Sequence, residues 1–517
     1  MSKINPYFVT VGGGQVHYLR GGSGPTLVLL HPLIGSSKSF RPILRLLADD
    51  FTVIAPDLPG FGLSDPIDAT IDLDVMAGVV LDFIECLNLR EPVLYGRELG
   101  AIIASRIAES EADKVSMIIA HDFPLESNDD GAKKYTGEPL IALWQELRDH
   151  HLSRLERNKP TPELDQIQQE FIDCAPLNDP FGAPMELIRA FDGYEALTAM
   201  QGRVEMIESS DKPAPTLPLN MGYTSFNDID LVATLTALAN DAGAQIAPPP
   251  VRSEPLPSPF MTKAYQDVGG RDILMQGRAG TGDTAILALH ELGLSADSFA
   301  DVFEGLRSDI TLLAPDIPHD ITSMDEITQF IGDCLALLPQ NPVILVRDAS
   351  AGVVLAALTA LGAEPRGLIL DLPVATTPEI AEKMCDFIAF DTTPKSYGEH
   401  IVHAIGRMRD RGLFWPWHNH DGDHHMHDER QLDPSVVRER VIKALSNPHY
   451  ADQLRLALGQ PVFDAVRDAP FPIAFLANPR LPISHDIKQL SRTTKLGLYL
   501  EMSGVEGIEA GLAALGY

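Results

Sequence analysis

The sequence predicts an α/β protein that contains one fold twice, each copy a mostly parallel sheet with flanking helices and an inserted helical cap. Three observations lead to this prediction. Blocks of the first half recur in the same order in the second half, short apolar runs alternate with helical patterns, and a proline-rich segment separates the halves. The length of 517 residues allows roughly two or three domains.

The duplication is visible in matched blocks. "VGGGQVHYLRGGSGPTLVLLHPLIGSSKSF" resembles "VGGRDILMQGRAGTGDTAILALHELGLSADSF", and each reads as a hairpin, a glycine-rich turn and an apolar strand that ends at a histidine, His31 or His290. "APDLPG" matches "APDIPH", "EPVLYGRELG" matches "NPVILVRDAS", and "TGEPLIALWQELRDHHL" matches "YGEHIVHAIGRMRDRGL". Blocks repeated in one order predict two copies of one fold, in which Glu98 corresponds to Asp348.

The elements of the first copy follow from its apolar runs. Strands are expected at Thr26–Leu30, Thr52–Ala55, Val93–Tyr95 and Val115–Ala120. These runs are apolar throughout, which is typical of parallel strands whose two faces are both covered. Helical patterns replace the strands at about 122–212 and again at about 373–469, so we expect a helical cap in each copy.

The join between the copies is a proline-rich segment. "IAPPPVRSEPLPSPF" carries six prolines, and such a segment is extended and semi-rigid. The predicted organisation is therefore a first domain at 1–247, a linker at 248–259 and a second domain at 260–517.

Composition narrows the class of partner. The net charge is −32, from 40 basic and 72 acidic residues. This charge argues against nucleic acid and against an anionic membrane surface as partners. The four cysteines lack CxxC spacing, which argues against a disulfide framework. The first residues show no signal-peptide pattern and no apolar run has the length of a membrane span, so a cytoplasmic protein is expected.

The stretch "VLYGRELGA" has the outline of a nucleophile elbow. Such an elbow is a strained turn between a strand and a helix, with the pattern Gly-x-Ser-x-Gly. Here Glu98 occupies the central position between Gly96 and Gly100. Together with "LLHPLIGSS", "APDLPGFGLSD" and the placement of the caps, this stretch resembles the α/β-hydrolase superfamily. The resemblance covers nearly the whole chain twice, and it is closer in the first copy.

The resemblance implies a hydrolase that acts without an organic cofactor on a small organic substrate, such as an ester, lactone or epoxide, held between core and cap. It also implies an acid after a late strand and a histidine before the last helix. The acid position is expected near Ser225 in the first copy, with Asp228 and Asp230 close by, and at Arg480 in the second. Neither Ser225 nor Arg480 is acidic. The second copy has "MSGVEGIEAGL" without a histidine, and the first copy is interpreted as ending before that segment.

Three roles are open for the elbow carboxylates of Glu98 and Asp348. A carboxylate can attack carbon and form an ester, as Asp does in the epoxide hydrolases and haloalkane dehalogenases that the chain resembles. It can exchange protons in a dry site. It can also be structural, paired with the adjacent Arg97 or Arg347 or with amides at the helix N-terminus.

The candidate catalytic set consists of the elbow acids with their arginines and two assisting histidines: Glu98, Asp348, Arg97, Arg347, His31 and His290. The arginines are expected to tune the acids or bind anions. A role in loop structure is the alternative for both histidines. His121, after a predicted strand, is expected to face either the site or the core.

A histidine-rich run, "FWPWHNHDGDHHMHDE", follows in the second cap. Its candidate metal ligands are His418, His420, His424, His425 and His427. Imidazoles and carboxylates suit zinc, nickel or copper, and adventitious binding of such ions is expected from composition alone. The alternative is an exposed polar loop after an aromatic anchor.

A second functional class remains open. The two copies could be a catalytically degenerate pair of hydrolase folds that serves as a binding or scaffold module. The absence of a late histidine from both copies favours this hypothesis, whereas the caps favour a ligand site.

Overall fold

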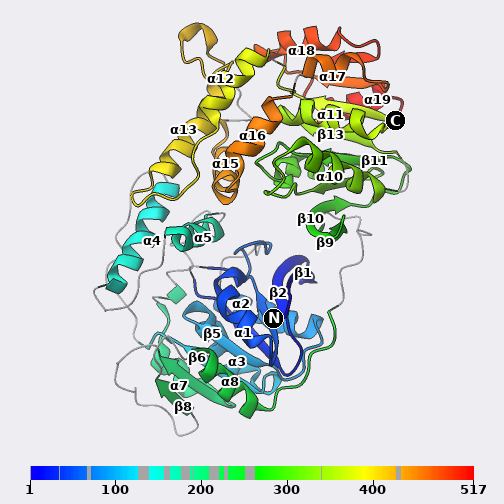
Figure 1. Cartoon of the computed structure of the whole chain (residues 1–517). Helices are drawn as coiled ribbons and strands as arrows, with labels where there is room; N and C mark the ends of the chain where they lie inside the picture. The colour runs from blue at the N-terminus through cyan, green and yellow to red at the C-terminus, as the bar shows by residue number, and fades with distance from the viewer. Residues whose placement is uncertain are drawn as a thin grey trace. The chain divides into compact units, whose positions relative to one another are not determined.

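The computed structural model describes residues 2–33, 35–66, 72–125, 139–155, 164–175, 187–188, 190–208, 221–225, 231–250, 262–338, 341–375, 377–426, 432–460 and 462–517. The chain divides into two compact units, Met1–Ser253 and Glu254–Tyr517, which we call the N-terminal and C-terminal units. Each contains one eight-stranded, mostly parallel sheet with helices beside it, as the fold-class prediction requires (Figure 1).

The N-terminal sheet has the strand order β1-β2-β4-β3-β5-β6-β7-β8. Its strands are β1 (Ile4–Val11), β2 (Gly14–Gly21), β3 (Thr26–Leu30), β4 (Thr52–Pro56), β5 (Val93–Arg97), β6 (Met117–His121), β7 (Val204–Glu208) and β8 (Met221–Ser225). β2 runs antiparallel to β1 and β4, and the pairs from β4 to β8 are parallel.

The C-terminal sheet repeats this order as β9-β10-β12-β11-β13-β14-β15-β16. Its strands are β9 (Thr262–Val268), β10 (Arg271–Arg278), β11 (Ala285–Leu289), β12 (Thr311–Pro315), β13 (Val343–Arg347), β14 (Gly367–Asp371), β15 (Ile473–Leu476) and β16 (Gly497–Leu500). The identical order agrees with the duplication inferred from the repeated sequence blocks.

Helices lie between the strands in both units. Those of the N-terminal core are α1 (Arg41–Leu47), α2 (Leu73–Cys86), α3 (Leu99–Ser110) and α8 (Leu231–Ala242), and between β6 and β7 lie the cap helices α4 (Pro139–Leu155), α5 (Leu164–Cys174) and α7 (Gly193–Ala199). Those of the C-terminal core are α9 (Ala300–Gly305), α10 (Met324–Ala336), α11 (Ala351–Leu361), α18 (Ile483–Ser491) and α19 (Gly504–Ala514), and between β14 and β15 lie the cap helices α12 (Pro378–Ile388), α13 (Glu399–Leu413), α15 (Pro434–Ser446), α16 (Tyr450–Leu458) and α17 (Val462–Arg467).

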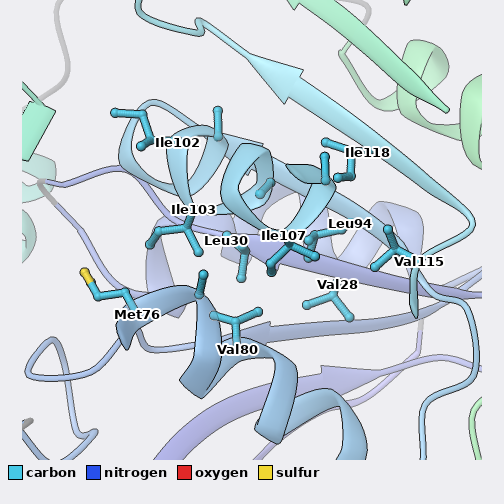
Figure 2. Packing of buried hydrophobic residues seen from close by; sticks show 14 of the residues in the cluster. Val28, Leu30, Met76, Val80, Leu94, Ile102, Ile103, Ile107, Val115 and Ile118 are labelled. Atoms are coloured by element: carbon cyan, nitrogen blue, oxygen red, sulfur yellow. The ribbon is translucent and has the colours of Figure 1, made fainter. Parts of the chain in front are cut away.

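Burial on both faces explains why the strands are apolar throughout. In β3, Val28 and Leu30 join one core cluster with residues of α2 and α3, and Leu27 and Leu29 join a second cluster on the other face. Successive strand residues point to opposite faces of the sheet. When helices cover both faces, every residue of the strand must therefore be apolar. Figure 2 shows Ile103 and Ile107 of α3 and Val80 of α2 packed over Val28 and Leu30.

Two expectations for the first copy differ from the structure. β7 lies at Val204–Glu208, inside the range expected to be a helical cap, and pairs in parallel with β6. The N-terminal unit also does not end early, because β8 and the closing helix α8 follow β7. Glu205 and Glu208 interrupt the apolar character of this strand, which is why its sequence did not read as a buried strand. Among the described helices, none is long and apolar enough to cross a membrane.

Acid is expected to destabilise the C-terminal unit through His400, a buried residue of α13. Burial lowers the pKa of His400 to about 4, while the unfolded value is about 6.5. Between these values the unfolded chain binds a proton that the folded chain does not, so the free energy of unfolding falls as the pH falls. His400→Asn, which keeps an acceptor for the Lys395 amide, should reduce this loss by about 1–3 kcal/mol. Urea unfolding of the wild type and the variant at pH 7.5, 5.5 and 4.5 measures this loss. An equal fall of the unfolding free energy with pH in both proteins would contradict the prediction.

Candidate active site

The N-terminal elbow lies where β5 passes into α3. Glu98 has φ 50° and ψ −110°, a conformation that few residues other than glycine adopt. The flanking glycines are required by close approach: a Cβ on Gly96 would lie 2.2 Å from the Gly100 carbonyl oxygen, and one on Gly100 would lie 2.2 Å from the Leu30 carbonyl oxygen. The strained turn therefore presents Glu98 at the carboxyl edge of the sheet, with its side chain 38% exposed.

Charged groups surround Glu98 in the N-terminal unit. Arg97 Nε lies 3.9 Å from Glu98 Oε1, and Arg97 Nη2 lies 3.4 Å from Asp122 Oδ2. Asp122 follows β6 and also has a positive φ of 48°. One guanidinium thus lies near two carboxylates.

His121 connects this charged cluster to the core. Its Nδ1 lies 2.5 Å from the buried Tyr95 hydroxyl, and its Nε2 lies 3.5 Å from Asp122 Oδ2. The strand register places His121 beside Arg97, and the Glu98 amide donates to the His121 carbonyl. Burial raises the pKa of Tyr95, so its hydroxyl stays neutral and can donate to the ring.

His31 and His290 hold loops in place. In each ring Nδ1 lies 2.7 Å from the carbonyl oxygen of the next residue, and Nε2 accepts from the Leu58 or Ile317 amide at 2.9 Å. Both rings are fully buried, and burial lowers their pKa. The alternative role in loop structure accounts for these contacts, and proton transfer by either ring would require a backbone hydrogen bond to break.

The central residue of the C-terminal elbow also has a positive φ, but its surroundings differ. Asp348 has φ 55°, but its side chain is only 10% exposed. Arg347 directs its guanidinium to Asp371, at 2.9 Å, and to Asp301, at 2.8 Å. The cations near Asp348 instead come from cap helices: Arg411 of α13 at 3.5 Å and Arg440 of α15 at 3.4 Å.

Arg411 also binds Glu291, which follows β11. The guanidinium and the carboxylate form two parallel hydrogen bonds of 2.6 Å, and both side chains are at most 2% exposed. Burial alone would lower the pKa of Arg411, but the carboxylates of Glu291 and Asp348 raise it above its ordinary value. The Arg411 guanidinium further lies 4.5 Å from the Trp417 ring centroid. The C-terminal elbow is therefore part of a buried ionic network.

This network occupies the amides that would stabilise an oxyanion. In α/β-hydrolase sites these are the amide after the nucleophile and an amide in the loop after the third strand. Here the Ala349 amide donates to Glu291 Oε2 at 3.4 Å, and the Leu292 amide donates to Ser350 Oγ at 2.9 Å. In the N-terminal unit Pro32 stands at the position of Glu291 and has no carboxylate to place there.

The described histidines of this run do not gather into one group. His424 pairs with Asp421, whereas His420 stacks on Phe414 and lies 3.8 Å from Asp410. His418 and His425 belong to the described part of this loop, and His427 lies outside it. Among the residues that the structure describes, no group of three or more histidine, cysteine or acidic side chains could hold a metal ion.

In the N-terminal unit, the loops that would hold the late acid and the late histidine can be read from the sequence only. The loops after β7 (209–220) and after β8 (226–230) lie outside the described residues and contain no histidine. The loop between β16 and α19, "EMS", contains none either. The acid position expected near Ser225 falls at the end of β8, one strand later than its counterpart after β15.

Several residues of the two sites were missed by sequence reasoning, namely Tyr95, Asp122, Glu291, Arg411 and Arg440. Asp122 and Glu291 had a usable signal, because each is an acid within two residues of the carboxyl end of a predicted strand. The cap arginines had none, since their position over the sheet depends on tertiary packing.

Comparison with known proteins supports an α/β-hydrolase fold for the N-terminal region, where residues 25–136 match the family model described as alpha/beta hydrolase fold. Haloalkane dehalogenase 2 of Mycobacterium tuberculosis is 34% identical over 107 residues, 20% of this chain and 37% of that protein. A soluble epoxide hydrolase of Corynebacterium sp. is 32% identical over 121 residues, 23% of this chain and 42% of that protein. The chain thus spans less than half the length of these curated relatives.

Among solved structures, Cfl2 from Burkholderia cenocepacia is similar with 21% identity and a TM-score of 0.37, covering 46% of this chain and 94% of that one. E-2-(acetamidomethylene)succinate hydrolase is similar with 22% identity and a TM-score of 0.35, covering 46% and 98%.

Proposed function

We propose that the N-terminal unit is a hydrolase site for a small organic ester, lactone or epoxide and that Glu98 is its catalytic carboxylate. The observation that carries the proposal is the strained, partly exposed placement of Glu98 between two sterically required glycines. Strain of this kind persists where the surrounding structure enforces it, and it concentrates at functional sites. The matched family model spans this elbow, and the names of the similar proteins, a dehalogenase and an epoxide hydrolase, support hydrolytic chemistry.

Glu98 would act as a general base in this proposal. Its carboxylate takes a proton from water while the water oxygen bonds to the electrophilic carbon of the substrate. Negative charge then develops on the substrate oxygen near the Leu99 amide, in the first turn of α3, whose amides have no acceptor within the helix. The proton passes to the departing oxygen as its bond to carbon breaks. This route requires no late histidine, in agreement with its absence from the sequence.

The C-terminal unit would not catalyse under this proposal. Glu291 lies at the Ala349 amide, and Arg411 and Arg440 hold Asp348. A substrate would have to displace a buried ion pair before it could reach this elbow.

The test is hydrolysis of a panel of aryl esters, lactones and epoxides by the whole chain and by Glu98→Gln and Asp348→Asn. We expect turnover that survives Asp348→Asn and is lost in Glu98→Gln. Loss in Asp348→Asn alone would reverse the assignment of the two units.

A binding module is the second candidate function, because both units lack the late histidine and one elbow is filled by the chain itself. Absence of turnover on the whole panel, with a ligand retained through purification, would support it.

A further inference from the structure

The two units carry opposite charges at one equivalent position where core meets cap. In each unit a short 3-10 turn follows the third strand, η1 (Ser37–Phe40) or η4 (Ala296–Phe299), after Ser36 or Ser295. The amide of the first turn residue donates to Asp57, at 2.7 Å, or to Asp316, at 2.6 Å. The second turn residue is Lys38 in η1 and Asp297 in η4. These two residues are therefore structural equivalents with reversed charge.

In the N-terminal unit the position binds an acid from the cap. Lys38 Nζ lies 3.1 Å from Oδ1 of Asp173, at the end of cap helix α5. Ser36 Oγ donates to Asp173 Oδ2 at 2.6 Å, and Gln169 Nε2 donates to Oδ1 at 2.9 Å. Asp173 is buried, so its charge depends on these partners.

In the C-terminal unit the position binds a base from the cap. Asp297 Oδ2 lies 2.5 Å from Nζ of Lys443, on cap helix α15. Burial alone would lower the pKa of Lys443, but the Asp297 and Asp316 carboxylates raise it above its ordinary value. Asp297 also accepts from Gln276 and from Ser295 Oγ. Each cap is thus anchored by an ion pair of opposite polarity.

We propose that this charge reversal makes each core accept only its own cap during folding. Two homologous units in one chain are liable to exchange equivalent elements, within a molecule or between molecules. A first cap on the second core would bring Asp173 to Asp297, and a second cap on the first core would bring Lys443 to Lys38. Like charges at a partly buried junction are unfavourable, and Asp173 is itself only 2% exposed, so the exchanged assemblies are selected against.

The test compares variants of the whole chain that differ only in which member of each core–cap ion pair is positive and which is negative. Lys38→Asp/Asp173→Lys keeps an opposite-charge pair in the N-terminal unit but gives both units the polarity of the C-terminal one. Asp297→Lys/Lys443→Asp equalises them in the other direction. The quadruple variant restores the difference with both polarities inverted. Each protein is unfolded in urea, diluted at several protein concentrations and separated by size-exclusion chromatography, with urea unfolding of the native fraction measured alongside.

We expect both double variants to give about threefold or more exchanged dimer and aggregate than the wild type, increasing with protein concentration. The quadruple variant should return toward the wild-type profile. Wild-type refolding of both double variants would overturn the proposal. It would equally be overturned if the quadruple variant misassembled as much as the two doubles combined, because lost stability alone would then explain the result. No step of this test requires either unit to be catalytic.

Discussion

Arg411→Met is expected to lower the free energy of unfolding of the C-terminal unit by about 3–5 kcal/mol, the range for removing one partner of a buried ion pair. The substitution leaves the Glu291 carboxylate buried without its bidentate partner and withdraws one of the cations near Asp348. Urea unfolding of the whole chain measures it. Because the chain has two compact units, one transition should move and the other should stay in place.

Arg409 provides a matched control on the same helix. Its side chain is 61% exposed beside Asp410, so Arg409→Met should change the free energy of unfolding by no more than about 0.5 kcal/mol. Adding Glu291→Gln to Arg411→Met should recover most of the loss, because the buried charge is removed while an acceptor for the Ala349 amide remains. A loss that the added Glu291→Gln leaves unchanged would show that packing against Trp417, and not the ion pair, is the main contribution of Arg411.

Glu98→Gln is expected to lower kcat/KM by about 10²–10⁴-fold for any panel substrate that the chain hydrolyses, the usual contribution of a general base. Glutamine has nearly the shape of glutamate and cannot take a proton from water. Its unfolding midpoint should stay close to that of the wild type, because the Glu98 side chain is 38% exposed and an ion pair at such a position contributes little to stability.

A single turnover in H₂¹⁸O separates the two chemical roles of Glu98. With an epoxide as substrate, general-base catalysis adds only solvent oxygen to the product, whereas attack by the carboxylate and hydrolysis of the resulting ester add an enzyme oxygen in the first turnover. Enzyme oxygen in the product would show that Glu98 forms a covalent intermediate and does not act as a general base. Unchanged turnover in Glu98→Gln would remove the elbow from the mechanism altogether.

The elbow was predictable because its signal is local. Gly96 and Gly100 have no room for a Cβ, so the backbone geometry itself demands the glycines that flank Glu98. β3 and β5 were predictable for a related reason, since burial on both faces demands apolar side chains at successive positions. β7 was not, because Glu205 and Glu208 interrupt the apolar run that marks a buried strand.

The filled state of the C-terminal elbow was not predictable from the sequence. Glu291 and Arg411 are 120 positions apart, and no local sequence pattern around either residue indicates that they pair. Arg347 illustrates the same limit. It is adjacent to Asp348 in sequence, yet its guanidinium forms ion pairs with Asp371 and Asp301. Side-chain pairing at these sites follows from how cap and loops meet, which periodicity does not encode.

The carboxylate of Glu291 at the Ala349 amide has an evolutionary consequence. Loss of Arg411 alone leaves the Glu291 carboxylate buried without its bidentate partner, and loss of Glu291 alone leaves the buried Arg411 guanidinium with the more distant Asp348, so each single substitution is costly. Only a concerted double change avoids the unstable intermediate. Substitutions that remove this ion pair one residue at a time therefore pass through a less stable protein, which tends to preserve the pair in the C-terminal unit.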